Sequence, residues 1–121
     1  IVDAIDSFTP KLNLLKAAYQ LKKKIIASGG AGGKTDPTKI EVVDVSKTHH
    51  CVFMQMVRKR LKKEKIYTGI DFVFSPELQS KTALIMTDGA NYKKSAYGTI
   101  SYMPAAFGGV CASVVIRELV K

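Results

Sequence analysis

The residues with the clearest chemical potential lie near the start of the chain, in the sequence IVDAIDSFTPK. Asp6 directly follows an apolar, strand-like run, and a carboxylate at the carboxyl end of a parallel strand can hold Mg²⁺ against nucleotide phosphates. Lys11 follows about one helical turn later, where its ammonium could reach phosphate oxygens. Asp3 lies inside the apolar run, where a charge is costly. We expect Asp3 either to be hydrogen-bonded within the fold or to join Asp6 and Lys11 at a nucleotide site.

A glycine-rich stretch, SGGAGGKT at residues 28–35, comes within one residue of a phosphate-binding P-loop. Its end, Gly33-Lys34-Thr35, fits the pattern, but Ser28 takes the place of the first glycine. A P-loop also needs a helix directly after it, because the free N–H groups of that helix hold the phosphates. Asp36-Pro37 follows instead and favours an extended chain. We expect a loop whose backbone closely approaches a ligand or strand, with Lys34 contacting RNA or phosphate, or else solvated.

A cationic run, RKRLKKEK, fills residues 58–65 with six Lys or Arg in eight positions. Such a run is typical of a solvated helix face, and it also suits a phosphate backbone, with salt-dependent affinity. The candidate RNA-binding residues are Lys34, Arg58, Lys59, Arg60, Lys62 and Lys63. Of the 19 Lys and Arg, 14 lie in residues 1–65, and the formal net charge is +9. This clustering favours a polyanionic partner, of which nucleic acid is the commonest.

The two cysteines lie far apart and form no C-x-x-C pair, which argues against a zinc site or a disulfide framework and favours a reducing cytosol. Cys51 follows His49-His50, which raises the hypothesis of a Cys–His nucleophile, although adjacent side chains rarely point at one another. Cys111 lies in an apolar run and is expected to be a buried packing residue. No apolar run is long enough to span a membrane.

The elements that must position these residues alternate between strands and helices. Strands are expected at residues 1–5, 24–28, 39–45 and 70–75, helices at 6–23, 50–63 and 102–120, and loops at 29–38 and 76–96. The opening strand–helix–strand order implies parallel pairing, and the whole pattern indicates an α/β fold. In the last helix, the small residues Gly108, Gly109 and Ala112 would permit close packing. An apolar strand at residue 1 needs neighbours on both sides, so we expect an upstream half to be missing.

Several segments, taken in order, resemble the tRNA threonylcarbamoyladenosine dehydratase family. They are IVDAIDS with the following PK, SGGAGGKTDPTKIEVVDVSKT, RKRL, FVFSPE and GTISYMPAAFGGVCASVVI. This family belongs to the ThiF/MoeB/HesA superfamily, which is related to ubiquitin-activating enzymes. The resemblance covers nearly the whole chain except the loop around residues 78–95, and the central glycine-rich segment is specific to this family within the superfamily.

The resemblance implies the C-terminal half of a ThiF/MoeB-like Rossmann-type domain, with a mixed sheet flanked by helices, as a single partial domain over residues 1–121. It implies ATP- and Mg²⁺-dependent dehydration, with ring closure, of N6-threonylcarbamoyladenosine at position 37 of tRNA. It also implies a cytoplasmic homodimer assisted by sulfur-relay proteins. Asp6 then matches the superfamily's magnesium-associated catalytic aspartate, and Lys11 matches a basic residue near the nucleotide.

Two departures and two alternatives accompany the resemblance. The family's phosphate-binding glycine loop lies in an N-terminal half outside these 121 residues, so we expect this polypeptide alone not to turn over ATP. The segment HHCVF stands where the family has Asp-Pro. The first alternative is an adenylyltransferase for a ubiquitin-like sulfur-carrier protein, although such enzymes commonly carry two C-x-x-C pairs. The second is a catalytically inactive, truncated fragment.

Overall fold

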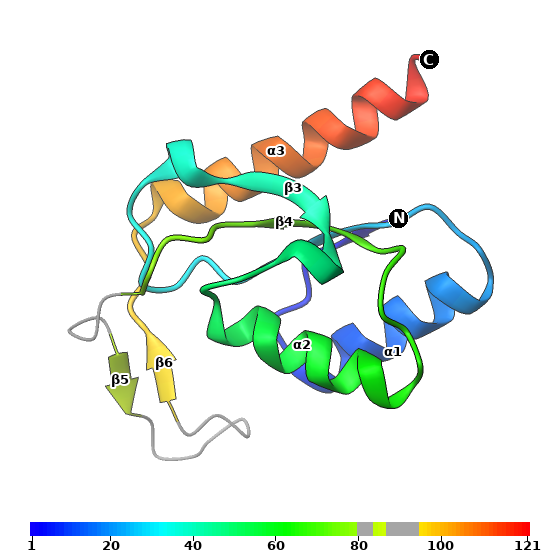
Figure 1. The fold of residues 1–121 in the computed structure, drawn as a ribbon. Coiled ribbons are helices and arrows are strands. Elements are labelled where there is room, and N and C mark those ends of the chain that lie inside the picture. The colour runs from blue at the N-terminus through cyan, green and yellow to red at the C-terminus, as the bar shows by residue number, and fades with distance from the viewer. Residues whose placement is uncertain (80–83, 87–94) are drawn as a thin grey trace.

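A four-stranded mixed sheet forms the centre of the molecule (Figure 1). The computed structural model describes residues 1–79, 84–86 and 95–121, with side chains in 1–79 and 98–121. The strands are β1 (Val2–Asp3), β2 (Ile26–Ser28), β3 (Glu41–Asp44) and β4 (Asp71–Phe74), in the order β1-β2-β4-β3. Strands β1, β2 and β4 are parallel to one another, whereas β3 pairs antiparallel with β4. The predicted α/β fold, with its parallel opening and mixed sheet, is confirmed.

Helices cover both faces of this sheet. Helices α1 (Phe8–Gln20) and α2 (Val52–Lys63) lie on one face, and α3 (Tyr102–Leu119) lies on the other (Figure 1). Short 3₁₀ turns, η1 (Pro37–Lys39) and η2 (Val45–Lys47), flank β3. Because side chains alternate along a strand, Phe72 of β4 enters the core under α1 and α2, whereas Val73 enters the core under α3.

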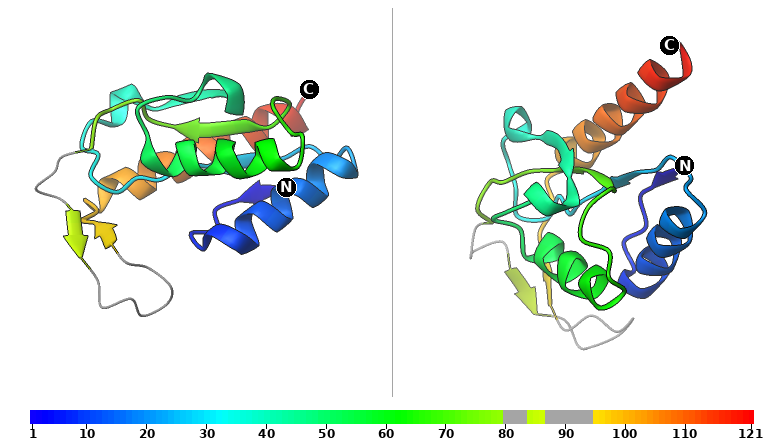
Figure 2. Two further views of the ribbon diagram at one scale, coloured as in Figure 1. Left: turned by 60° about the horizontal axis from the view of Figure 1, so that its bottom comes forward. Right: turned by 45° about the vertical axis from the view of Figure 1, so that its right-hand side comes forward.

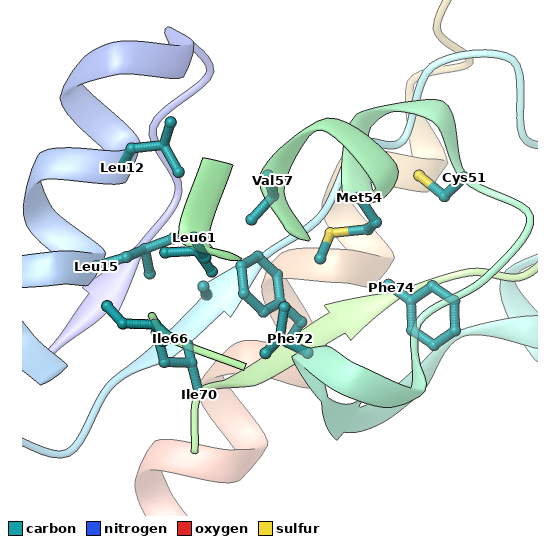
Figure 3. Close-up of a cluster of buried hydrophobic side chains, with 12 residues drawn as sticks. Leu12, Leu15, Cys51, Met54, Val57, Leu61, Ile66, Ile70, Phe72 and Phe74 are labelled. Atoms are coloured by element: carbon teal, nitrogen blue, oxygen red, sulfur yellow. The ribbon is translucent and has the colours of Figure 1, made fainter. Parts of the chain in front are cut away.

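The larger core lies between the sheet and the pair α1 and α2 (Figure 3). Helix α2 contributes Met54, Val57 and Leu61, whose spacing puts them on one helical face, and each is at most 2% exposed. Burying a side chain of this size contributes about 1.5–3 kcal/mol, so this stripe fixes α2 against the sheet. The other faces of α2 carry the cationic run and remain toward solvent.

A hairpin occupies part of the segment for which the sequence predicted a loop. Strands β5 (Leu84–Met86) and β6 (Ser95–Tyr97) pair antiparallel, so the loop prediction for 76–96 was wrong at these strands. Residues 80–83 and 87–94 lie outside the described part of the chain. A three-residue strand gives almost no periodic signal in the sequence, because its stability comes from its partner and not from its own residues.

Helix α3 is apolar along most of its length, yet much of it is exposed. Its C-terminal end extends beyond the sheet (Figure 2), and Ile116, Leu119 and Val120 there are 58%, 77% and 77% exposed. The expected close packing at Gly108 and Gly109 is not observed within the described part of the chain, since a Cβ at either position would have no neighbour there within 4 Å. Among the described residues, no helix has the length and apolar character needed to cross a membrane.

Candidate functional site

The candidate site lies where the parallel strands end. We call the segments that follow β1, β2 and β4, residues 4–6, 29–31 and 75–77, the carboxyl edge. Asp6 lies there, exposed, directly before Ser7, the N-cap residue of α1. A pocket of about 370 Å³ opens beside this edge, between Ser28 and Gly29 on the sheet side and Phe107 and Gly108 of α3. Ligands of open α/β sheets bind at such an edge.

The structure pairs Asp3 and Lys11 with each other in a buried ion pair. Lys11 Nζ lies 2.8 Å from Asp3 Oδ2, and the two side chains are 1% and 0% exposed. Asp3 Oδ1 also accepts a hydrogen bond from Ile5 N at 3.0 Å, and Lys11 Nζ donates to Ile5 O at 3.3 Å. Of the two expectations for Asp3, hydrogen bonding within the fold is the one observed.

Aromatic rings complete the surroundings of the Lys11 ammonium. Its Nζ lies 5.7 Å from the ring centroid of Phe53 and 5.8 Å from that of Phe72. Ring faces attract a cation, and removal from water strengthens this attraction. Lys11 is therefore held inside the protein, and its ammonium binds the carbonyl of Ile5, the residue before the exposed Asp6.

The glycine loop, residues 29–36, is not a P-loop. It leads into η1 and then β3, so no α-helix begins after it. Gly29 meets the neighbouring strand, because a Cβ there would lie 3.1 Å from Val73 O and 3.2 Å from Phe74 Cβ. Gly33 has φ of 73°, a conformation that glycine adopts without penalty. The expected close approach to a strand is thus observed at Gly29.

Lys34 is the anchor of the glycine loop. It is 1% exposed, and its Nζ donates to Ser75 O at 2.7 Å and Glu77 O at 2.9 Å. Burial lowers the pKa of the Lys34 ammonium, while Cys51 and Glu77 act in the opposite direction. Because the ammonium points into the protein, Lys34 is neither the solvated lysine nor the exposed RNA contact considered from the sequence.

The Glu77 carboxylate also holds the glycine loop, by accepting hydrogen bonds from it. It accepts hydrogen bonds from Thr35 N at 3.0 Å, Thr35 Oγ1 at 2.9 Å and Asp36 N at 2.9 Å. Burial raises the pKa of Glu77, but these donated hydrogen bonds outweigh it and lower the pKa below its ordinary value. With Lys34, they form what we call the loop clamp, Lys34, Thr35 and Asp36 held by Ser75 and Glu77. Sequence reasoning missed it, because its partners lie more than forty residues apart.

The cationic face of α2, formed by Arg58, Lys59, Arg60, Lys62 and Lys63, has cations of two kinds. Arg58 donates to Thr48 O at 2.7 Å and to Thr48 Oγ1, and the Arg60 guanidinium lies 5.6 Å from the Phe8 ring centroid. Both arginines thus have a contact within the protein, although Arg60 is itself exposed. Lys59, Lys62 and Lys63 of α2 are exposed, and so is Lys65 in the turn after the helix. The structure therefore presents four lysines of the run to solvent.

The Cys–His hypothesis finds no support in the geometry. Cys51 is 4% exposed, at the N-cap of α2, and makes no capping hydrogen bond. The His49 ring packs edge-on against His50 at 5.0 Å and against Phe74 at 5.6 Å, and its Nδ1 lies 3.1 Å from Lys47 O. Cys111 is buried as predicted. Within the described ranges, no group of three or more His, Cys, Asp or Glu could hold a metal ion.

The fold and the carboxyl edge define the class of the protein: an α/β domain with a mixed sheet of the nucleotide-binding type. The chain belongs to the ThiF family, whose model matches residues 1–121. It is 30% identical to the tRNA threonylcarbamoyladenosine dehydratase of Bacillus subtilis, over 100% of this chain and 50% of that protein. It is 32% identical to the Escherichia coli dehydratase, over 98% of this chain and 51% of that protein.

The solved structures agree with these relatives. The crystal structure of E. coli tRNA N6-threonylcarbamoyladenosine dehydratase in complex with ATP matches with a TM-score of 0.80 and 32% identity, covering 98% of this chain and 46% of that one. The complex of the same enzyme with AMP matches equally well, at a TM-score of 0.80. The resemblance stated from the sequence is confirmed, and the chain spans about half the length of the curated relatives it matches.

Proposed function

We propose that this chain forms part of an ATP-dependent tRNA threonylcarbamoyladenosine dehydratase, acting on the modified adenosine at position 37 of tRNA. The observation that carries the proposal is the match of 98% of the chain to the ATP-bound E. coli dehydratase, at a TM-score of 0.80. The exposed carboxylate of Asp6 at the carboxyl edge supports it, because nucleotides bind at this edge in related folds.

Asp6 is the residue to which we assign the catalytic and Mg²⁺-associated role. Mg²⁺ is usually held by one or two carboxylates together with substrate phosphates and water. A single exposed carboxylate suits an ion that arrives with ATP, and the described residues contain no cluster that could cage a metal without it. ATP, when bound, supplies the activating group for the substrate's carboxylate. Asp3 and Lys11 position Asp6 through their hydrogen bonds to Ile5.

The tRNA would lie along the cationic face of α2. Lys59, Lys62 and Lys63 are exposed there and suit phosphate contacts. Each contact releases bound counterions, so the logarithm of affinity should fall with that of salt concentration by about 0.7–0.9 per phosphate neutralised. Arg58 and Arg60 belong to the same face and also contact Thr48 and Phe8, and Lys34 is left out of the proposed contacts because it is buried.

The assembly we propose is a cytoplasmic homodimer that receives help from a sulfur-relay protein. The exposed apolar residues at the end of α3, Ile116 and Leu119 together with Val120 just after the helix, support a covered surface in the assembled protein. The cytoplasmic assignment rests on two cysteines that are both free in the described structure. Sedimentation equilibrium tests the dimer, and a single monomeric species at all concentrations would contradict it.

The test of the function uses the polypeptide as its organism makes it. Incubated with ATP, Mg²⁺ and threonylcarbamoyl-tRNA, it should remove one water from the modified nucleoside, as followed by mass spectrometry. Asp6→Asn should lower the rate by about 10²–10³-fold, the range for losing one electrostatic contact to a transition state. Asp71→Asn, which removes an exposed carboxylate at the start of β4, should leave the rate unchanged. Adenylation of a sulfur-carrier C-terminus without tRNA dehydration would contradict the proposal.

A second test concerns the 121 residues by themselves. Neither their sequence nor their described structure contains a glycine loop that opens an α-helix, which is the usual phosphate cradle of this fold. We expect this polypeptide alone to show no ATP–pyrophosphate exchange. Measurable exchange by the pure polypeptide would mean that the glycine loop or the carboxyl edge binds triphosphate unaided.

A further inference from the structure

We propose that a groove beside α2 binds one unstacked nucleotide of single-stranded RNA, with the base against Tyr67 and its phosphates at Lys59 and Lys62. This proposal rests on the proposed function in taking tRNA as the source of the RNA, and it adds a nucleotide subsite to the cationic face. We call this feature the α2 groove; its volume of about 430 Å³ falls within the range of about 300–1,000 Å³ usual for small-ligand sites.

The α2 groove has an apolar floor and polar walls. Val45, Leu61 and Ile66 form the floor and are 1%, 2% and 3% exposed. Lys59 and Lys62 line one wall from α2, and Tyr67, 58% exposed, lines the groove from the turn that follows the helix. A nucleotide combines a base with apolar faces and a negatively charged phosphate, so this combination of surfaces matches both parts of a nucleotide.

The turn after α2 builds this arrangement. Lys65 N donates to Lys62 O and Ile66 N donates to Leu61 O, each at 3.0 Å, and Lys65 adopts a φ of 60°. This pattern of two bonds closes the helix and reverses the chain direction. Ile66 then enters the floor while the next residue, Tyr67, stays at the surface, so the aromatic ring and the α2 lysines lie around one groove.

The charges around the α2 groove favour an anionic ligand. None of the described residues that line it is acidic. The nearby Glu64 pairs with Lys16 of α1 at 2.9 Å, and Asp44 accepts hydrogen bonds from Ser46 N at 2.9 Å and Gly69 N at 2.7 Å. Both carboxylates thus bind groups outside the groove lining, and the described residues that line the groove carry only positive charge.

An aromatic ring and cations together are the means by which proteins hold single strands. Stacking of a base on an aromatic side chain contributes about 1–3 kcal/mol per base, and it tolerates any base because every base has a π face. Lysines alone would bind double-stranded and single-stranded RNA by charge without needing an exposed ring. The exposed Tyr67 beside an apolar floor is the feature that favours an unstacked base.

The experiment measures fluorescence anisotropy of a labelled RNA pentanucleotide and of the same pentamer lacking its central base, with the polypeptide as its organism makes it. Tyr67→Ala should weaken binding of the intact pentamer by about five- to fiftyfold and leave the abasic pentamer unaffected. Tyr67→Phe keeps the ring and should bind as the unaltered protein does. Lys59→Ala and Lys62→Ala should each lower the slope of log affinity against log salt concentration by about the amount expected for one phosphate contact. Lys121→Ala, outside the groove, should leave this slope unchanged.

Several results would overturn the α2 groove as a nucleotide site. One is that Tyr67→Ala and the unaltered protein bind the intact pentamer with equal affinity. Another is that Tyr67→Phe loses as much affinity as Tyr67→Ala. A third is that an acidic peptide binds the protein and loses affinity to the same extent in Tyr67→Ala. Tyr67 is exposed, so its substitution should preserve the fold, which circular dichroism checks. The dehydration assay separates the two proposals. If Tyr67→Ala dehydrates tRNA with an unchanged KM for tRNA, only the α2 groove proposal is contradicted. If RNA binding depends on Tyr67 but no dehydration occurs, only the proposed enzymatic function is contradicted.

Discussion

The loop clamp makes a quantitative prediction about Lys34. The Lys34→Met substitution keeps the length and apolar stem of the side chain but removes the ammonium that donates to Ser75 O and Glu77 O. A buried carbonyl that loses its hydrogen-bond donor costs about 1–3 kcal/mol of stability, and Lys34→Met removes the donor from two carbonyls. Part is recovered because the charged group no longer has to be desolvated, which is the effect that lowers the pKa of Lys34. We expect a net loss of about 2–4 kcal/mol in the free energy of unfolding.

Urea unfolding followed by circular dichroism measures this loss. With a slope of about 2 kcal/mol per molar urea, which is ordinary for a domain of this size, the midpoint should fall by about 1–2 M. Lys39→Met is the matched control, because Lys39 is exposed in η1 and its substitution should change stability by less than about 0.5 kcal/mol. A loss below about 1 kcal/mol for Lys34→Met would refute the clamp, since it would mean that water satisfies both carbonyls.

Other expected outcomes concern the buried pair, the helix end and the outer half of the clamp. Lys11→Met leaves Asp3 buried without a cation and should cost about 3–5 kcal/mol in urea unfolding; a loss below about 1 kcal/mol would show that water reaches the pair. Lys65→Gly relieves the φ of 60° and should raise the thermal midpoint by about 3–5 °C, and a fall would contradict the strain. Glu77 has a lowered pKa, so its ionised form stabilises the fold above the ordinary value of 4.5, and this stabilisation is lost as pH falls through the folded-state pKa. Glu77→Gln should therefore be less stable near neutral pH and lose stability less steeply in acid; equal pH profiles would contradict the clamp.

The elements with long periodic patterns could be predicted from the sequence. Helix α2 was expected at residues 50–63 and is observed at Val52–Lys63, because apolar residues repeat there with the helical period. The face expected from the sequence was Phe53, Val57 and Leu61, and the buried stripe is Met54, Val57 and Leu61. The parallel pairing of β1 with β2 followed from the helix between them. The hairpin of β5 and β6 could not be predicted in this way, since three residues do not establish a period.

The functional residues were harder to predict because charge was taken to mean exposure. Asp3 was expected either within the fold or at the site, Lys11 near phosphate, and Lys34 at RNA or phosphate or else in solvent; all three are buried and bonded within the protein. The partner of Asp3 lies eight residues away, within reach of a local argument, whereas those of Lys34 lie 41 and 43 residues away. Such distant partners can be found only once β2 and β4 are known to be neighbours.

The same separation has a consequence for the order of folding. The Lys34 ammonium cannot meet Ser75 O or Glu77 O until β4 has docked beside β2, because these contacts close loops of 41 and 43 residues. Closing such loops costs chain entropy that only the finished sheet repays. The glycine loop should thus take its final form after the rate-limiting step of folding. Substitutions in it should give kinetic φ-values near zero, meaning that they change the folding barrier little for a given loss of stability. Substitutions that weaken the contacts of the glycine loop should increase the unfolding rate and leave the folding rate almost unchanged, so the loop determines the lifetime of the native state.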